Sequence, residues 1–264
     1  MASSFTSKVQ AYTSPTARSG AAGFYRVYVD ADSVYASAWN YSGGGDFEGT
    51  ARFTADGEML WMYNCLGDNY DVVSMNDSVY TVGHPHDCDP INGWPDTNPR
   101  QFQRASAFTK SAEGVNGHNV GNVIYRDAHY GEPAPALINW NPDVSTGGYT
   151  GQYQAAWDTT GDGRYLLLGG EFPSVNGANQ QGIARFALPS IAPSTQRPRP
   201  GDDGFAVNAT ARGNDTARLT WNARADRDDL TLTYQVLRDG STAPIASFTA
   251  DATWWNTPTL GYVD

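Results

Sequence analysis

The amino-acid sequence predicts an all-β protein, and three observations lead to this prediction. Glycine (28 residues), proline (15) and aromatic residues (12%) are frequent in the 264-residue chain, which is typical of short strands joined by many turns. Strand-length runs of apolar or alternating residues are bounded by turn residues, and no window shows a long helical period. A similar short pattern also occurs three times along the chain, which indicates a repeat fold.

The clearest copy of the repeat follows the Asp162-Gly163 turn, where glycine accepts a positive φ without steric cost. Residues 164–168 form a short apolar run of strand length. Asn176-Gly177 marks a second turn, and residues 183–186 begin an alternating strand. We therefore expect consecutive antiparallel strands in this part of the chain.

Two further copies of the repeat lie upstream. Residues 25–35 align without gaps on residues 70–80, and residues 153–165 form a third copy with two extra residues around its turn. The tyrosines that begin and end each copy are predicted to pack between sheets. A later strand follows each copy, at residues 50–53, 105–108 and 183–186. Each unit is about four short strands, and radial packing of such small sheets predicts β-propeller-like blades.

The third unit resembles a known family. Its Gly169-Gly170-x-Phe172, Val175-Asn-Gly177 and Gly182-Ile-Ala-Arg-Phe186 motifs are similar to the delta-60-type repeat of secreted bacterial β-propeller proteins. The resemblance covers roughly residues 24–188. It implies a surface or secreted role such as adhesion, glycan binding or assembly. Proteins of this group often continue into fibronectin type III domains.

The last part of the chain has a different pattern. Residues 190–203 are proline-rich and predict a semi-rigid linker between a repeat region at 1–189 and a second domain at 204–264. That domain offers about five strands, whereas immunoglobulin-type sandwiches have seven in about 100 residues. Trp221 on its second strand and residues 234–238 on its third resemble a fibronectin type III domain. We expect a truncated sandwich of that type.

The predicted ring of blades is incomplete. Three units cannot close a ring, since propellers typically have about four to eight blades. The third unit lacks an obvious fourth strand, and residues 8–12 are a candidate to supply it. Residues 1–22 contain no apolar core of signal-peptide type, so a mature form or a piece of a longer protein is expected. Missing chain segments or other protein chains are the expected partners.

Charge and hydropathy exclude some classes of partner. The net charge of −11 would repel phosphate backbones, so we expect no nucleic-acid partner. Simple solubility is the plainer explanation of this acidity. No apolar run approaches the ~20 residues needed to span a bilayer, so no membrane span is expected.

Cys65 and Cys88 are the only cysteines. An even, low count in a protein of this composition fits a disulfide in an oxidising compartment, hence a secreted or cell-surface location. Such a bridge would close a loop of roughly 20 residues and contribute perhaps ~3 kcal/mol. Two unpaired buried thiols are the alternative.

The second unit carries the candidate binding residues. Its long loops are the first choice for binding, because binding residues usually lie on loops of a rigid scaffold. His84, His86 and Asp87 form a dense polar cluster that superficially resembles the His-x-His-x-Asp-His signature of metallo-hydrolases, but the final histidine is missing. A polar loop tethered by the cysteine bridge is the alternative, and we expect neither a metal nor a cofactor. Trp94 is predicted to be an exposed contact residue or a loop anchor.

No nucleophile elbow, phosphate loop, dinucleotide fingerprint or zinc-protease motif is present. The segment that starts at Asp158 imitates a calcium loop but has Gly169 at its twelfth position instead of glutamate. We therefore predict an extracellular, non-catalytic binding, adhesion or structural protein. A carbohydrate-active enzyme, or a lectin-like propeller that binds glycans through the second unit's loops, is the alternative.

Overall fold

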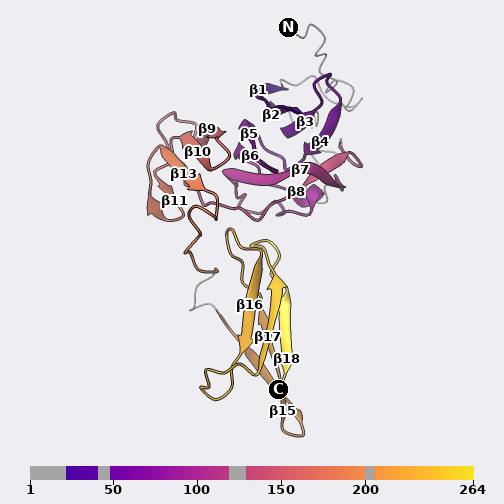
Figure 1. Cartoon of the computed structure of the whole chain (residues 1–264), viewed down its shortest axis with the longest axis vertical. Coiled ribbons are helices and arrows are strands. Elements are labelled where there is room, and N and C mark those ends of the chain that lie inside the picture. Colours follow the sequence, from indigo (N-terminus) through magenta and orange to yellow (C-terminus); the bar gives the residue numbers. More distant parts are fainter. Residues whose placement is uncertain (1–21, 41–47, 119–128, 200–204) are drawn as a thin grey trace. The chain divides into compact units, whose positions relative to one another are not determined.

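The computed structural model describes residues 22–40, 48–118, 129–199 and 205–264, and the chain divides into two compact units after Pro193 (Figure 1). Within these ranges the regular elements are β-strands and a single 3-10 helix, η2 (Asp89–Ile91). The predicted all-β class is confirmed. The candidate strand at residues 8–12 lies outside the described residues. Among the described residues, no helix is long and apolar enough to cross a membrane.

The first sheet is antiparallel, with its four strands side by side in chain order. They are β1 (Ala22–Val29), β2 (Val34–Asn40), β3 (Gly49–Phe53) and β4 (Met59–Tyr63). The turn between β1 and β2 is set by Asp30, whose Oδ1 accepts the backbone N–H groups of Asp32 and Ser33, each at 2.9 Å. This is the local turn that aspartate favours, because its side chain satisfies backbone donors that a turn leaves unpaired.

The second sheet repeats this arrangement. Its strands are β5 (Asn69–Met75), β6 (Ser78–Gly83), β7 (Ala105–Val115) and β8 (Pro133–Leu137). The connection between β6 and β7 is the long insertion of this unit, and it contains η2 and Cys88.

The third sheet has three strands within the described residues, in the order β13-β10-β9. They are β9 (Ala156–Gly161), β10 (Tyr165–Gly170) and β13 (Ile183–Ala187). The expected Asp162-Gly163 turn is present, and Asp162 accepts the backbone N–H groups of Arg164 and Tyr165 just as Asp30 does in the first sheet.

A small hairpin of β11 (Ser174–Val175) and β12 (Ala178–Asn179) follows β10. Its turn is the predicted Asn176-Gly177 pair, with φ of 53° and 78°. Two consecutive positive φ values are what a two-residue hairpin turn requires, which is why asparagine and glycine are favoured there.

The three sheets are equivalent strand by strand, but the third aligns differently from the prediction. The first strand of each sheet carries one bulged residue, where its register with the next strand shifts, and these residues are Tyr25, Tyr70 and Trp157. Trp157 is thus the third member of the set. Tyr153 was expected there, but it precedes β9 and 69% of its surface is exposed.

The equivalence of Tyr165 with Tyr35 is also wrong. Tyr35 lies opposite Arg52, and the residue opposite Arg185 in the third sheet is Leu167. The third turn is as long as the first, so the two extra residues of the predicted alignment are not needed. The tyrosine pattern misled the prediction because Tyr153 and Tyr165 imitate its spacing.

Each sheet packs one face on the next sheet. Each sheet has a forward face and a back face. The forward face carries Tyr35 in the first sheet, Tyr80 in the second and Leu167 in the third. These three residues occupy equivalent positions, opposite Arg52, Ala107 and Arg185. Strand alternation places every second residue on the same face.

The forward face of the first sheet packs on the back face of the second. The ring of Phe108 stacks on Tyr63 at 4.4 Å between centroids and meets the edge of Trp61 at 5.5 Å. The main-chain carbonyl of Lys110 accepts hydrogen bonds from Arg52 Nη1 at 2.6 Å and Trp61 Nε1 at 2.8 Å. Aromatic packing and satisfied donors therefore hold this joint.

The forward face of the second sheet packs on the back face of the third. Val73 and Val82 from the second sheet lie in one apolar cluster with Leu166 and Leu168 from the third. Both leucines are at most 2% exposed. Burial of this kind contributes about 1.5–3 kcal/mol for each large side chain.

The second compact unit, residues 194–264, contains the five strands expected in the last part of the chain. They are β14 (Asn208–Gly213), β15 (Thr216–Asn222), β16 (Thr231–Val236), β17 (Ala246–Asp251) and β18 (Thr259–Val263). One sheet has the order β14-β15-β18 and the other pairs β16 with β17. Trp221 and Tyr234 lie in the small core between them, and Tyr234 Oη accepts the backbone N–H of Arg224 at 2.8 Å.

Candidate functional site

The bulged aromatic residues of the first three sheets meet. Tyr70 lies between the other two, with ring centroids 5.4 Å from Tyr25 and 4.5 Å from Trp157. Trp39 on β2 extends the group on the far side of Tyr25, at 6.1 Å. We call Trp39, Tyr25, Tyr70 and Trp157 the aromatic row. Tyr25 is 42% exposed, Trp39 and Trp157 are half-buried, and Tyr70 is 6% exposed, so the row has an anchored centre with more accessible rings beside it.

A bulge explains why these rings gather. The extra residue in a bulged strand disrupts the ladder locally and re-aims a side chain. Because the bulge occupies the same place in β1, β5 and β9, and β5 contacts both β1 and β9, the three re-aimed rings converge.

A polar residue follows each bulged aromatic, and these residues also meet. Arg26 Nη2 lies 2.9 Å from Asp158 Oδ2, and Arg26 Nε lies 3.6 Å from Asp71 Oδ1. Asp71 accepts backbone N–H groups from Val72 at Oδ1 (2.9 Å) and from Thr159 at Oδ2 (2.8 Å). One arginine and two carboxyl groups from three sheets thus form a charged cluster beside the aromatic row.

The pKa values of the two carboxyl groups shift in opposite directions. Burial raises the pKa of Asp71 to about 7, and the hydrogen bond and the negative charge of Asp158 act in the same direction. The pKa of Asp158 is lowered, first by that hydrogen bond from Asp71 and then, against the opposing effect of burial, by Arg26. Protonated Asp71 therefore donates to ionised Asp158 near neutral pH, as expected for two carboxyl groups at hydrogen-bond distance.

This separation differs from that of a glycosidase pair. Glycosidases place their two carboxyl groups about 5–5.5 Å or about 6.5–9.5 Å apart, so that a sugar or a water fits between them. Asp71 and Asp158 hydrogen bond directly to each other. The pair is therefore suited to polar contact with a ligand and to holding a proton.

His84, in the β6–β7 insertion of the second sheet, contacts the aromatic row through the ring of Tyr70. Asp68 donates its backbone N–H to His84 Nε2 at 3.3 Å, so Nδ1 carries the proton and donates to Tyr70 Oη at 2.5 Å. His84 and His86 both meet the ring of Phe102 edge-on, at 5.6 and 5.9 Å. Burial, and then neighbouring positive charge, lowers the pKa of both histidines to about 4, so they are neutral at pH 7.

The other predicted binding residues lie apart from the row. Asp87 is 1% exposed and its Oδ1 accepts the backbone N–H of Asp89 at 3.2 Å. Trp94 is also 1% exposed, and its carbonyl accepts the backbone N–H of Cys88 at 2.6 Å. The expectation of an exposed Trp94 is corrected by this burial, and the loop-anchoring alternative fits the structure.

Cys65 and Cys88 form the expected disulfide, which joins the segment after β4 to the β6–β7 insertion. The backbone N–H groups of His86 and Asp87 also donate to the Cys65 carbonyl, each at 3.2 Å. The bridge and these bonds fix the loop that presents His84 and His86, so the cysteines act on the site through loop position.

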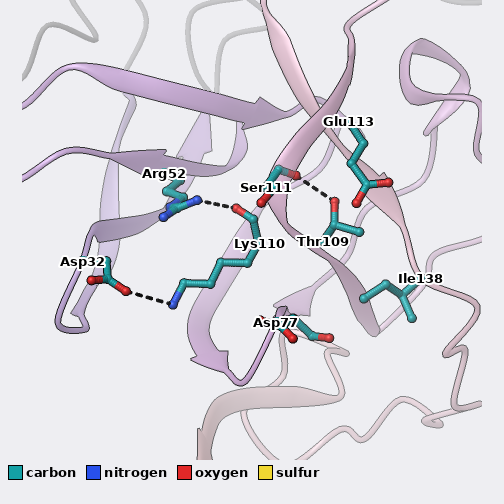
Figure 2. Close-up of a pocket in the computed structure, with 9 residues that line it drawn as sticks. Asp32, Arg52, Asp77, Thr109, Lys110, Ser111, Glu113 and Ile138 are labelled. Atoms are coloured by element: carbon teal, nitrogen blue, oxygen red, sulfur yellow. Dashed lines mark hydrogen bonds and ion pairs between the residues drawn. The ribbon is translucent and has the colours of Figure 1, made fainter.

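A polar cavity of about 560 Å³ lies between the first two sheets, lined by residues of the β1–β2 and β5–β6 turns and of β7. Figure 2 shows the side chains that line it. Lys110 Nζ forms ion pairs there with Asp30 at 2.8 Å and with Asp32 at 3.8 Å. Arg52, also in the cavity wall, donates to the Lys110 carbonyl and to Ser33 Oγ. Both cationic side chains are therefore engaged in holding the sheets together.

Among the described residues, one group of three possible metal ligands has its ligand atoms within 4.8 Å of one another. It consists of Asp226, Asp228 and Asp229 in the second compact unit. Burial and the neighbouring Asp226 raise the pKa of Asp228 to about 6. Acidic clusters of this kind are common without an ion, and this one has no further feature that indicates a ligand.

Sequence inspection missed the aromatic row and the carboxyl pair. The gap-free alignment of residues 25–35 on 70–80 already contained Tyr25-Arg26 and Tyr70-Asp71 at equivalent positions. Extending it without gaps to the third copy would have found Trp157-Asp158.

No protein-family model, no curated protein and no solved structure matches this chain.

Proposed function

We propose that this protein is an extracellular, non-catalytic binding protein and that the aromatic row binds glycans. In this proposal the first compact unit, residues 1–193, is part of a β-propeller, and the second, residues 194–264, is a fibronectin type III-like sandwich. The observation that carries the binding proposal is the junction of accessible aromatic rings with a charged cluster on three equivalent strands. Sugars are bound by stacking of their apolar faces on aromatic rings and by hydrogen bonds from their hydroxyls to fixed polar groups.

The architecture supports the propeller part of the proposal. Three strand-by-strand equivalent sheets pack forward face on back face, and their first strands lie next to one another in the order β1, β5, β9. Radial repetition of small antiparallel sheets with adjacent inner strands is the arrangement of propeller blades.

The second unit supports the sandwich part. In immunoglobulin-type sandwiches the first, second and fifth strands share one sheet and the third strand lies in the other. The order β14-β15-β18, with β16 in the other sheet, follows that rule, whereas the fourth strand β17 pairs with β16 and not with the first sheet, where constant-type immunoglobulin domains place it. The disulfide supports an oxidising compartment, where such bridges persist.

A glycan array followed by calorimetry of the best ligand tests the binding proposal. We expect Trp157→Ala and Tyr25→Ala each to weaken binding about tenfold, the equivalent of ~1.4 kcal/mol. Tyr149→Ala is the matched control, because Tyr149 is 95% exposed and takes no part in the aromatic row. An absence of array binding, or equal losses in all three variants, would contradict the proposal.

The enzyme alternative predicts a different outcome with the same ligands. If the raised pKa of Asp71 serves proton donation to a leaving group, reducing ends would be released on incubation, and Asp71→Asn would stop the release. The non-catalytic proposal predicts no release by either protein.

A further inference from the structure

Arg104 immediately precedes β7 and lies beside the centre of the aromatic row. Its carbonyl accepts the backbone N–H of Gly83 at 3.3 Å, and the next residue, His84, hydrogen bonds to Tyr70. The guanidinium carbon of Arg104 lies 5.1 Å from the centre of the Phe102 ring, which His84 also contacts at 5.6 Å. Backbone pairing and the Phe102 ring therefore place a half-buried guanidinium next to the residues that surround Tyr70.

One part of this guanidinium is fixed and another is available to a ligand. Arg104 Nη1 donates to Gln154 Oε1 at 2.5 Å, and the Gln154 backbone N–H donates to Glu171 Oε1 at 3.1 Å. Within the described part of the chain, Nε and Nη2 of Arg104 have neither a hydrogen-bond acceptor nor a carboxylate partner, and neither nitrogen is sealed from solvent. Gln154 thus holds the side chain in place and leaves its Nε–Nη2 edge open.

The chain itself shows what this edge of an arginine binds. Arg100, in the same insertion, donates from Nε to Asp96 Oδ1 at 3.1 Å and from Nη2 to Asp96 Oδ2 at 2.7 Å. The two parallel N–H donors match the two oxygens of a carboxylate, which gives geometric specificity as well as binding free energy. Arg104 presents the same pair of donors without a carboxylate from the described residues.

The charges around Arg104 favour an anionic ligand, although the chain as a whole carries −11. The exposed Arg26 of the site is already engaged by Asp158 and Asp71. Burial lowers the pKa of Arg104, and no carboxylate of the described residues opposes this effect. Burial, and then the positive charge of Arg104, lowers the pKa of His84. A half-buried cation without a counter-charge is a place where a ligand's negative charge is stabilised.

We propose that Arg104 binds the carboxylate of an acidic sugar, such as a uronic or sialic acid residue, while the aromatic rings beside it bind the sugar rings. This inference rests on the proposed glycan-binding function and names the class of glycan. Tyr70, His84 and Phe102 follow one another with 5.6 Å between ring centroids, and Phe102 is 40% exposed. One oligosaccharide can therefore contact the row and Arg104 together.

Calorimetry of the full chain with matched ligands tests the carboxylate. The ligands are sialyllactose and an oligogalacturonide, each as the free acid and as its methyl ester, which keeps the sugar rings and removes the charge. We expect the acids to bind about 10- to 100-fold more tightly than the esters, the usual range for charge-assisted hydrogen bonds. Added salt should narrow this difference, because it screens charges that are partly exposed.

Variants of Arg104 locate the preference. Arg104→Gln should abolish the preference for the acid and leave the affinity for the ester unchanged, which also shows that the variant keeps an intact site. Arg104→Lys keeps the charge but loses the paired donors, so it should retain only part of the preference. Arg185→Gln is the matched control, because Arg185 is exposed on the third sheet and packs over the Tyr165 ring.

The outcomes separate this inference from the proposed function. Equal affinity of the wild type for acid and ester, or an undiminished preference in Arg104→Gln, would overturn the role of Arg104. The proposed function would still stand if Trp157→Ala weakened binding of the esters. Binding of neither form would contradict both. Loss of ester binding in both Arg104 variants would show a purely structural role, and tighter binding of sulfated than of carboxylated oligosaccharides would overturn the carboxylate assignment.

Discussion

The proton shared by Asp71 and Asp158 predicts an unusual dependence of stability on pH. The pKa of Asp71 is raised to about 7 in the folded chain, against about 3.9 for an unfolded aspartate. A raised pKa means that the folded state binds the proton more tightly. The stability contributed by this group is therefore complete below about pH 4 and is lost as the pH rises through about 7.

The magnitude follows from the two pKa values. On lowering the pH from 8 to 6.5, Asp71 should increase the free energy of unfolding by about 0.8 kcal/mol. His84 and His86 act in the opposite direction, because their pKa values are lowered to about 4 in the fold. Protonation of the unfolded histidines costs about 0.4 kcal/mol of stability each over the same interval. The stability of the wild-type chain should therefore be nearly level between pH 8 and 6.5.

Asp71→Asn removes one of these opposing contributions. The variant should lose about 0.8 kcal/mol between pH 8 and 6.5, while the wild type stays level. Urea unfolding at the two pH values measures the difference, with the transitions of the two units fitted separately. Carbon-13 NMR titration of the Asp71 carboxyl group gives its pKa directly. A carboxyl pKa below about 5, or equal pH dependence in both proteins, would refute the shared proton.

Three further predictions concern the joints and the loop, and urea unfolding of the first unit measures each. Arg52→Met should cost about 1–3 kcal/mol, because it removes a charged donor that joins the first two sheets; an unchanged midpoint would contradict this. Cys65→Ser with Cys88→Ser should cost about 2–4 kcal/mol, and a reducing agent should lower the stability of the wild type alone. Leu168→Ala should cost about 2–5 kcal/mol. Leu167→Ala, at its 37% exposed neighbour on the forward face, should cost under about 1 kcal/mol, so similar losses would contradict the assignment of faces.

Short stretches of the sequence determine the local features of this protein. The Asn176-Gly177 turn and the Asp162 turn form where they were predicted, because side-chain chemistry and permitted φ values select a turn over a few residues. The five strands of the second unit follow in the same way from alternation and turn spacing. Two cysteines allow a single pairing, so the sequence identified Cys65 and Cys88 as the partners of any disulfide, and the structure shows that the bond forms.

Features that join distant segments required the folded chain. Asp71 and Thr159 are separated by 88 positions in the sequence. Packing of the second sheet on the third brings Asp71 Oδ2 within 2.8 Å of the Thr159 backbone nitrogen and buries the carboxyl group. Trp94 is buried within the insertion that the disulfide tethers, and its carbonyl accepts the backbone N–H of Cys88 there. The predicted alignment of the third repeat is wrong because Tyr153 and Tyr165 have nearly the spacing of the earlier tyrosine pairs. The true register is set by the backbone pairing of β9, β10 and β13. Turn and strand preferences act over a few neighbours, whereas burial and pKa depend on whichever sheet the fold places alongside.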